Sequence, residues 1–320
     1  MNRLRHLSTD GLPTLVASHL GQPTGAPSFH CIPTGEFNTS YFVRGWEREL
    51  VLRIAPPDDA GFVFYERRMM AQEPEIHKTV RARTSAPLPE ILAYDDSRRL
   101  IDLDYLIMER LPGRPLADLG SVSRSFHDRV LYQTGEYLRQ IHGITSEMYG
   151  YLGAHKPMPP QEDWPSAFRV MWDMMVDDVS ASGHYSESEA QSMRGLLSAN
   201  WSHFQRPVPS SLLHMDIWSQ NVLVDDTGRV TGILDLDRAC WGDPEIEFAI
   251  LDYCGFSDAA FWEGYGRERD LSSSARIRQV FYMLYELQKY IPIRQWRHGD
   301  SAGAVRYKRQ VLDLAAKLRG

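Results

Sequence analysis

Between residues 214 and 221 the chain reads His214-Met215-Asp216-Ile217-Trp218-Ser219-Gln220-Asn221. The histidine, aspartate and asparagine have the spacing H-x-D-x-x-x-x-N, and Asp235 follows after two short apolar runs. Phosphoryl transfer from a nucleotide needs a carboxylate that receives the proton of the acceptor hydroxyl, and oxygen ligands that hold magnesium against the phosphates. Asp216 suits the first role, and Asn221 and Asp235 suit the second. The spacing therefore predicts a phosphoryl-transfer loop; an ordinary polar turn before a hairpin is the alternative.

The apolar runs between the two candidate magnesium ligands predict a hairpin. Residues 222–224 and 230–234 are short and β-prone, with the turn Asp225-Asp226-Thr227-Gly228 between them. Most of the chain after residue 115 instead has apolar residues at helical spacing. We expect helices over Ser125–Ile144, Ala167–Val179, Ser186–Phe204, Ala275–Ile291 and Tyr307–Leu318. The hairpin would lie among these helices and return Asp235 to the neighbourhood of Asn221.

The first hundred residues predict a small antiparallel sheet. Four short apolar runs, at residues 40–43, 50–54, 91–94 and 105–108, are typical of strands. A helix is expected from Phe62 to Ala71. Two prolines and a glycine between Leu111 and Pro115 would interrupt any regular element. The sequence thus predicts an α+β chain with a sheet-containing N-lobe at residues 1–111 and a mostly helical C-lobe at residues 112–320.

Three segments of the second half together resemble the aminoglycoside phosphotransferase and choline kinase-like family. They are Leu213 to Asn221, Ile233-Leu234-Asp235, and Gly242-Asp243-Pro244 with Glu247-Phe248-Ala249. The resemblance covers nearly the whole chain in order and is sharp in its second half. It implies a two-lobed protein-kinase-like fold, with ATP or GTP and Mg²⁺ bound between the lobes and phosphate passed to an alcohol group.

The resemblance also implies a role for each matching residue. Asp216 would be the catalytic aspartate, and Asn221 and Asp235 would be the magnesium ligands. His214 would support the loop by packing and hydrogen bonding, and Asp243 would be a structural aspartate that steadies it.

Three neighbouring residues are less closely tied to the family pattern. Glu247 stands where the family usually has aspartate, and we expect this departure to affect packing more than chemistry. Asp237 would point to the same side of an extended segment as Asp235 and could support the metal ligands. His142, near a helix end, is expected to be a core or capping histidine.

In the N-lobe the resemblance implies a strand-borne cation on the phosphates and a helical carboxylate that holds the cation. Arg53 ends an apolar strand, and Glu66 lies 13 residues later in the expected helix. The family usually has lysine where this chain has Arg53. Arginine keeps the charge and offers a bidentate fork for phosphate, with altered geometry. The alternatives are an arginine at a sheet edge and a glutamate on a solvated helix face.

Five further residues would contact the nucleotide by resemblance: Gly35, Thr39, Ser40, Glu109 and Leu111. Backbone amides near the glycine, and the two hydroxyls, could approach phosphate in a short loop of the family's G-E-x-N type. Backbone groups of the last two residues would bind the base where the lobes join. A plain hairpin turn is the alternative for the loop.

Composition excludes several classes of protein. With 43% hydrophobic and 24% charged residues, the chain is an ordinary globular protein. Its formal net charge of −7 argues against a nucleic-acid partner and leaves room for a cationic ligand. No apolar run has the length of a membrane span, and no apolar signal core follows the basic N-terminus. Three unevenly spaced cysteines do not predict disulfides, so we expect a cytoplasmic protein, with no oligomeric state implied.

The acceptor is less well specified. Residues 243–270 contain eight acidic and two basic residues, and in the family the helices after the catalytic loop line the acceptor pocket. Carboxylates there would bind the ammonium groups of an aminoglycoside-like antibiotic; the plainer alternative is that most of them face water. Aromatic side chains that could stack on sugars or quaternary ammonium groups, or belong to the core, are Trp218, Trp241, Tyr253, Phe261, Trp262 and Tyr265.

These features favour a magnesium-dependent phosphotransferase that uses ATP or GTP and acts on a hydroxyl of an aminoglycoside-like antibiotic, and so confers antibiotic resistance. A kinase of a choline-like alcohol, sugar or amino alcohol is the first alternative. A pseudokinase is the second, and the presence of Asp216, Asn221 and Asp235 together argues against it. A metal-dependent hydrolase is the third, and it lacks histidines at ligand spacing near the aspartates.

Overall fold

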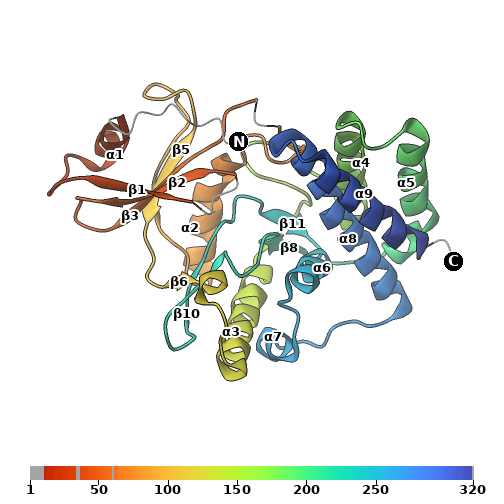
Figure 1. Ribbon diagram of the computed structural model, residues 1–320. Helices are drawn as coiled ribbons and strands as arrows, with labels where there is room; N and C mark the ends of the chain where they lie inside the picture. Colours follow the sequence, from red (N-terminus) through yellow and green to blue (C-terminus); the bar gives the residue numbers. More distant parts are fainter. Residues whose placement is uncertain (1–10, 34–36, 60, 319–320) are drawn as a thin grey trace.

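The structure of the chain is a computed structural model, and it describes residues 11–33, 37–59 and 61–318. Figure 1 shows two lobes, with the strands of the first part of the chain on one side and the long C-terminal helices on the other. The expected α+β architecture, with an antiparallel-sheet N-lobe and a helical C-lobe, is confirmed. No helix within these ranges is long and apolar enough to cross a membrane.

The N-lobe sheet has five antiparallel strands in the order β1-β2-β3-β5-β4. The strands are β1 (Ser28–Ile32), β2 (Thr39–Arg44), β3 (Leu50–Ile54), β4 (Ile91–Asp95) and β5 (Tyr105–Glu109). Arg53 is on the central strand β3, where it pairs with Ser40 of β2 and Leu106 of β5. Because β3 has a neighbour on each side, the backbone of Arg53 is held in place and the arginine is not at a sheet edge.

Two N-lobe elements, β1 and helix α1 (Leu12–Leu20), were not predicted. Leu12, Leu15 and Val16 are buried against the apolar face of β2, β3 and β5. Their i, i+3, i+4 spacing is the signal of an amphipathic helix, so the sequence did contain the information for α1.

The helix expected between Phe62 and Ala71 is wrong. Residues 64–68 form turns, Arg68 has a left-handed backbone (φ 57), and a short 3₁₀ helix η2 (Met69–Gln72) leads into α2 (Glu73–Arg83). A proline and two glutamates in the first turn of α2 favour a helix start at this point, because proline fits there and acidic groups complement the helix dipole. The helical glutamate nearest the lobe interface is therefore Glu73.

The C-lobe is built from seven α-helices among the described residues: α3 (Arg124–His142), α4 (Trp164–Ala181), α5 (Glu187–Ala199), α6 (Pro244–Cys254), α7 (Ala259–Tyr265), α8 (Ser273–Pro292) and α9 (Ser301–Ala316). The five predicted helices are confirmed, with shifted ends, and α6 and α7 are additional. Short 3₁₀ segments η3 (Leu116–Leu119) and η4 (Trp201–His203) and a π-helical turn η5 (Ile293–Arg297) complete the lobe. An aromatic core around Trp164, Phe168 and Tyr282 packs α4 against α8.

Two three-stranded sheets lie between these helices and position the segment 214–221. The predicted hairpin is confirmed as β9 (Val222–Val224) and β10 (Val230–Ile233), with β6 (Arg114–Pro115) as its third strand. The other sheet contains β7 (Thr145–Ser146), β8 (Ser210–Leu213) and β11 (Cys240–Gly242). The segment starts where β8 ends, and Asp235 follows β10. The N–H of Leu234 donates to the carbonyl of Asn221 (2.9 Å), so the two candidate magnesium ligands lie side by side.

Candidate active site

A cleft of about 850 Å³ lies between the lobes, and most of the predicted site residues line it. The predicted residues in its lining are Ser40, Arg53, Glu66, Glu109, Leu111, Asp216, Asn221 and Asp235. Thr39 belongs to β2 and is not in the lining, and Gly35 falls outside the described residues. The fold thus brings side chains that lie far apart in the sequence to one opening between the sheet and the helices.

Asp216 and Asn221 are joined directly. The Asn221 amide nitrogen donates to the backbone carbonyl of Asp216 and to its Oδ2, both at 2.9 Å. This fixes the asparagine with its nitrogen toward Asp216, and in the described structure its Oδ1 accepts no hydrogen bond. Burial raises the pKa of the Asp216 carboxyl, and the positive charge of Lys289 opposes that rise. A carboxylate with a raised pKa is a better proton acceptor near neutral pH.

Two non-glycine residues of the site have a left-handed backbone: Met215 (φ 68) and Asp235 (φ 69). Such a conformation costs roughly 1–2 kcal/mol and persists only where neighbouring groups impose it. Met215 is fully buried, its N–H donates to Glu247 Oε1 (2.7 Å), and its carbonyl accepts from Arg238 Nη1 (2.8 Å). Asp235 is held through its Oδ1, which accepts from Arg53 Nη2 (2.7 Å).

The residue that steadies the loop is Glu247 and not Asp243, which corrects both expectations. The buried Glu247 carboxylate accepts the backbone N–H of His214 (3.0 Å) and of Met215 (2.7 Å). It also contacts His142 Nε2 (2.8 Å), whose Nδ1 is bonded to Tyr265. Although burial raises the pKa of Glu247, these hydrogen bonds outweigh it and hold the pKa below its ordinary value. The glutamate therefore affects the geometry of the loop and does more than fill space.

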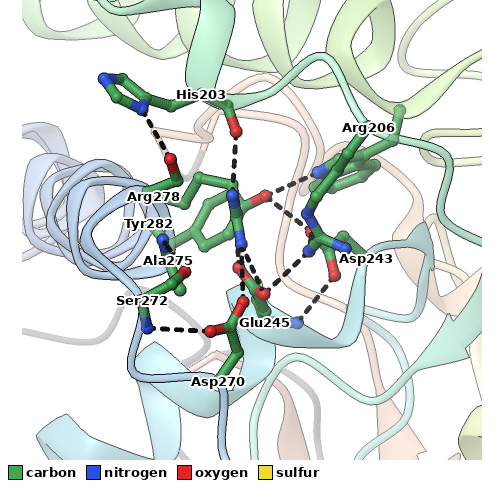
Figure 2. Close-up of polar contacts among 11 residues, drawn as sticks. His203, Arg206, Asp243, Glu245, Asp270, Ser272, Ala275, Arg278 and Tyr282 are labelled. Carbon is green, nitrogen blue, oxygen red and sulfur yellow. Dashed lines mark hydrogen bonds and ion pairs between the residues drawn. The ribbon is translucent and has the colours of Figure 1, made fainter.

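Asp243 instead belongs to a charged network at the N-terminal end of α6, shown in Figure 2. It is the N-cap of α6, where its Oδ1 accepts the N–H of Glu245, and its Oδ2 accepts from Arg206 (2.6 Å) and Tyr282 (3.0 Å). Arg278 joins the network through Glu245 (2.7 Å). In the described structure none of Asp243's hydrogen bonds reaches residues 214–221, so it anchors the start of α6 and acts on the loop only through that helix.

His214 links the loop to the segment that carries Asp235. Its Nδ1 accepts the N–H of Asp216 (3.2 Å), and its Nε2 lies 2.9 Å from the carbonyl of Leu234. These partners assign the neutral tautomer with the proton on Nε2. The ring is fully buried, so it holds the segment of Asp216 and the segment of Leu234 at a fixed separation.

Arg53 connects the two lobes at the base of the cleft. Its guanidinium donates to Glu73 Oε2 (2.7 Å), Asp235 Oδ1 (2.7 Å) and Asp237 Oδ2 (3.2 Å). The expectation that Glu66 holds Arg53 is wrong, because α2 begins later than predicted and presents Glu73 instead. Glu66 pairs with Arg297 of η5 (2.5 Å) and caps a turn through the N–H of Val63. Asp237, expected to support the metal ligands, does share Arg53 with Asp235.

The electrostatic balance of this cluster follows from its burial. Arg53 is 7% exposed and Glu73 is fully buried. Burial would lower the pKa of Arg53, but the facing carboxylates raise it above its ordinary value. Burial raises the pKa of Glu73 to about 7 and raises that of Asp237 well above its ordinary range. The facing carboxylates therefore keep the buried guanidinium protonated.

The acidic residues of segment 243–270 do not line the cleft, which corrects the expected source of ammonium-binding carboxylates. Asp243, Glu245, Asp252 and Asp270 pair with arginines, and Glu247 pairs with His142. Among the candidate aromatic residues Trp218 and Tyr253 line the cleft, and Phe261 and Tyr265 belong to the core. The cleft lining also contains residues that were not predicted. Those from α8 and η5 include Glu286, Lys289, Tyr290 and Arg294.

Comparison with known proteins adds to this geometry. A family model described as "Phosphotransferase enzyme family" matches residues 31–276. A probable ketoamine kinase from Vibrio vulnificus is 27% identical over 79% of this chain and 82% of its own length. A probable ketoamine kinase from Vibrio cholerae is 28% identical over 67% of this chain and 71% of its own length.

Solved structures share the fold over almost the whole chain. A protein assigned as a fructosamine-3-kinase from Haemophilus somnus has a TM-score of 0.69 at 16% identity, with 96% of both chains covered. A thermostable mutant of aminoglycoside phosphotransferase APH(4)-Ia, in ternary complex with AMP-PNP and hygromycin B, has a TM-score of 0.68 at 20% identity, with 96% of this chain and 98% of that chain covered. At these identities the likeness shows the kinase-like fold.

Replacing Glu247 with alanine should destabilise the segment 214–221, because its carboxylate accepts two backbone N–H groups of that segment. Two buried N–H groups and His142 would lose their acceptor, and we expect the free energy of unfolding to fall by about 2–4 kcal/mol. Hydrogen exchange at the amides of His214 and Met215 should rise in parallel. Chemical denaturation and exchange measured by mass spectrometry read both effects.

The matched control is Glu263→Ala, which removes an exposed carboxylate from α7 and should change stability by less than about 0.5 kcal/mol. Equal stability and equal amide protection in the Glu247→Ala variant and the unaltered protein would contradict the role given to Glu247.

Acid should destabilise the site through His77, which lies on α2 beside Glu73. Burial of the ring lowers the pKa of His77 to about 4, and this outweighs the hydrogen bond from Nδ1 to the carbonyl of Pro89, which favours the protonated form. The folded state then binds fewer protons than the unfolded state below pH 6.5, so the contribution of neutral His77 is complete above that pH and is lost as pH falls toward 4.

Between pH 7.5 and 5 this loss amounts to about 2 kcal/mol. The His77→Asn variant keeps a donor for the Pro89 carbonyl and has no group that titrates at this position. Over the same pH range its free energy of unfolding should therefore fall by about 2 kcal/mol less than that of the unaltered protein. Parallel pH profiles from urea unfolding would contradict this. His30→Asn, at an exposed position of β1, is the control and should follow the unaltered profile.

Proposed function

The chain belongs to the phosphotransferase enzyme family, and from that premise we propose that it moves the γ-phosphate of ATP, or of GTP, to a hydroxyl of a small polyhydroxylated metabolite of the ketoamine type. The observation that carries the proposal is the meeting of Asp216, Asn221 and Asp235 in one interlobe cleft. The ketoamine kinases among its relatives support the acceptor class.

The nucleotide would occupy the side of the cleft between the sheet and the hairpin. Apolar side chains line this side from both lobes: Val51 and Met108 from the N-lobe, and Leu223 and Leu234 from the C-lobe. Two apolar surfaces facing each other suit a flat base. Backbone groups of Glu109 and Leu111 lie at the junction of the lobes, where they would bind the base edge. The N–H of Glu109 already donates to the carbonyl of Glu90, so its carbonyl is the better candidate.

The residues present fit a magnesium ion. The amide nitrogen of Asn221 is committed to Asp216, which leaves its Oδ1 for a cation. Asp235 gives one carboxylate oxygen to Arg53 and keeps the other, and its side chain is 34% exposed to the cleft. Magnesium prefers oxygen ligands and commonly takes only one or two from the protein, the rest coming from phosphates and water. When bound, the ion would neutralise charge on the phosphates.

Asp216 would act on the acceptor. Its carboxylate receives the proton of the acceptor hydroxyl while that oxygen forms a bond to the γ-phosphorus. The bond from the γ-phosphorus to the bridging oxygen breaks, and the nucleoside diphosphate leaves with the electron pair. The raised pKa of the carboxyl supports this role. Asn221 keeps the carboxylate oriented through Oδ2.

Arg53 would do the work for which the family usually has lysine. Its fork binds Glu73 with one nitrogen and Asp235 with the other, a span that a single ammonium group cannot make. Arg53 would thus align Asp235, the proposed magnesium ligand, and would also face the phosphates. Its place in a complete ion cluster argues against the pseudokinase alternative. The hydrolase alternative lacks support too, since the described residues contain no cluster of three histidine, cysteine, aspartate or glutamate side chains able to hold a metal.

The acceptor end of the cleft favours a metabolite over an aminoglycoside antibiotic. None of the acidic residues between 243 and 270 lines the cleft, so the carboxylates expected for a polycationic acceptor are elsewhere. An aminoglycoside remains the competing acceptor, because the APH(4)-Ia complex shares the fold.

Asp216→Asn should abolish transfer while the nucleotide still binds. Loss of the proton acceptor should lower the rate by about 10²–10⁴-fold, and the dissociation constant for magnesium-ATP should change by less than about twofold because Asp216 faces the acceptor. Nucleotide consumption is measured across ketoamines, sugars, choline-like alcohols and aminoglycosides. The control is Asp226→Asn, in the exposed hairpin turn, which should behave like the unaltered protein. Near-normal turnover without the Asp216 carboxylate would overturn the assignment.

A further inference from the structure

One face of helix α8 lines the end of the cleft that we assign to the acceptor. Glu286, Lys289 and Tyr290 of α8 face it, and the π-helical turn η5 continues the same face with Ile293, Arg294 and Arg297. The wider turn begins directly after Pro292 at the end of α8. π-helical turns are rare and often occur at functional sites. Here the turn keeps two further arginines on the cleft side of the helix.

The carboxylates on and beside this face are already paired. Glu286 is shared by Arg238 (2.9 Å) and Lys289 (2.5 Å), and it is 2% exposed. Glu66, across the cleft, is taken by Arg297 (2.5 Å). One carboxylate between Arg238 and Lys289 leaves an excess of positive charge, which the Asp216 carboxylate, also in the cleft lining, partly offsets.

Arg294 has no such partner. Within residues 11–33, 37–59 and 61–318, no carboxylate lies within 4.0 Å of its guanidinium and no hydrogen bond leaves it, although the residue is only partly exposed. A guanidinium carries five N–H donors in a planar fork that matches an oxyanion. A partly buried arginine with its donors unused therefore marks a place where a ligand's negative group can bind.

The position of Arg294 relative to Asp216 assigns it to the acceptor. Lys289 and Asp216 line the same cleft, and the positive charge of Lys289 acts on the Asp216 carboxyl, so this face reaches the proposed proton acceptor. Arg294 follows five residues later, roughly 7 Å along the helix axis. On the nucleotide side the corresponding cation is Arg53, which pairs with Asp235.

Aromatic rings line the same cleft as Arg294. Tyr290 stacks on Tyr307 with ring centroids 4.8 Å apart, and the Tyr307 hydroxyl lies 3.3 Å from that of Tyr253. Tyr253 and Trp218 are each about 40% exposed, and all of these rings line the cleft. Exposed aromatic faces suit the C–H faces of a polyhydroxylated chain or ring.

We infer that the acceptor carries an oxyanion, a carboxylate or a phosphate, bound by Arg294 while its polyhydroxylated part lies on the tyrosine cluster and presents a hydroxyl to Asp216. This inference rests on the proposed function, and it excludes a polycationic acceptor. Among ketoamines it selects those whose amine part bears an acidic group.

The test uses acceptors that differ only in charge. The ketoamine formed from glucose and glycine carries a carboxylate, and the one formed from glucose and glycinamide does not; a hexose monophosphate beside its parent hexose separates phosphate from carboxylate. In one of these pairs we expect kcat/KM to be higher for the anionic acceptor than for its uncharged counterpart by about tenfold or more, because the KM of the anionic acceptor is lower. Arg294→Gln should reduce that preference to within about twofold and leave kcat and the KM for ATP unchanged. The control Arg276→Gln removes an exposed arginine from α8 outside the cleft and should keep the preference.

Each outcome is decisive. A preference for the uncharged members or for aminoglycosides, an unchanged preference in the Arg294→Gln variant, or a loss of ATP affinity in that variant would overturn the inference while leaving phosphoryl transfer established. If the unaltered protein transfers phosphate to no acceptor, the proposed function fails separately. Titration calorimetry of the ADP-loaded protein then decides the inference: binding of an anionic member that is lost in Arg294→Gln supports it, and its absence from the unaltered protein or its persistence in the variant contradicts it.

Discussion

The ion cluster around Arg53 is the interaction on which the rest of the site depends. One buried guanidinium binds Glu73 of α2, which belongs to the N-lobe, and Asp235 and Asp237, which follow the C-lobe hairpin. Removing Arg53 would leave the three carboxylates facing one another without a cation, which is costly for buried groups. The cluster therefore sets the approach of the two lobes, and with it the width of the cleft and the position of Asp235 opposite Asn221.

The opposite side of the cleft is organised by a second set of buried charges. Glu247 holds the backbone N–H groups of the loop, while Arg238 holds the Met215 carbonyl and pairs with Glu286. Together they maintain a left-handed backbone at Met215, which turns Asp216 toward the cleft. Glu286 also binds Lys289, so the support beneath the loop continues into the helix face that leads to Arg294. Glu286 thus connects the geometry of the loop with the helix face that we propose for acceptor binding.

Local sequence patterns predicted many of the elements, missed α1 although its spacing was visible, and failed where tertiary contacts decide. The hairpin and the five long C-lobe helices are local signals, and they were predicted correctly; the role of the segment from His214 to Asn221 stays a prediction. The partner of Arg53 could not be obtained from spacing, because Glu66 and Glu73 are both plausible until the helix start is known. The exchange of roles between Asp243 and Glu247 depends on how α6 packs under the loop. The acidic residues after residue 243 were counted correctly, but only the fold shows that arginines and a histidine pair with five of them and that none lines the cleft.

The most direct test of this account is a double-mutant cycle between Arg53 and Glu73, with magnesium-ATP affinity measured by titration calorimetry. Arg53→Lys keeps the charge and loses the fork, and Glu73→Gln removes the anchor, so each should weaken binding by about tenfold. The double variant should bind about as weakly as either single variant, with a coupling free energy of at least about 1 kcal/mol. Unchanged affinities, or effects that simply add, would show that Arg53 does not position the nucleotide site through Glu73 and would contradict the account.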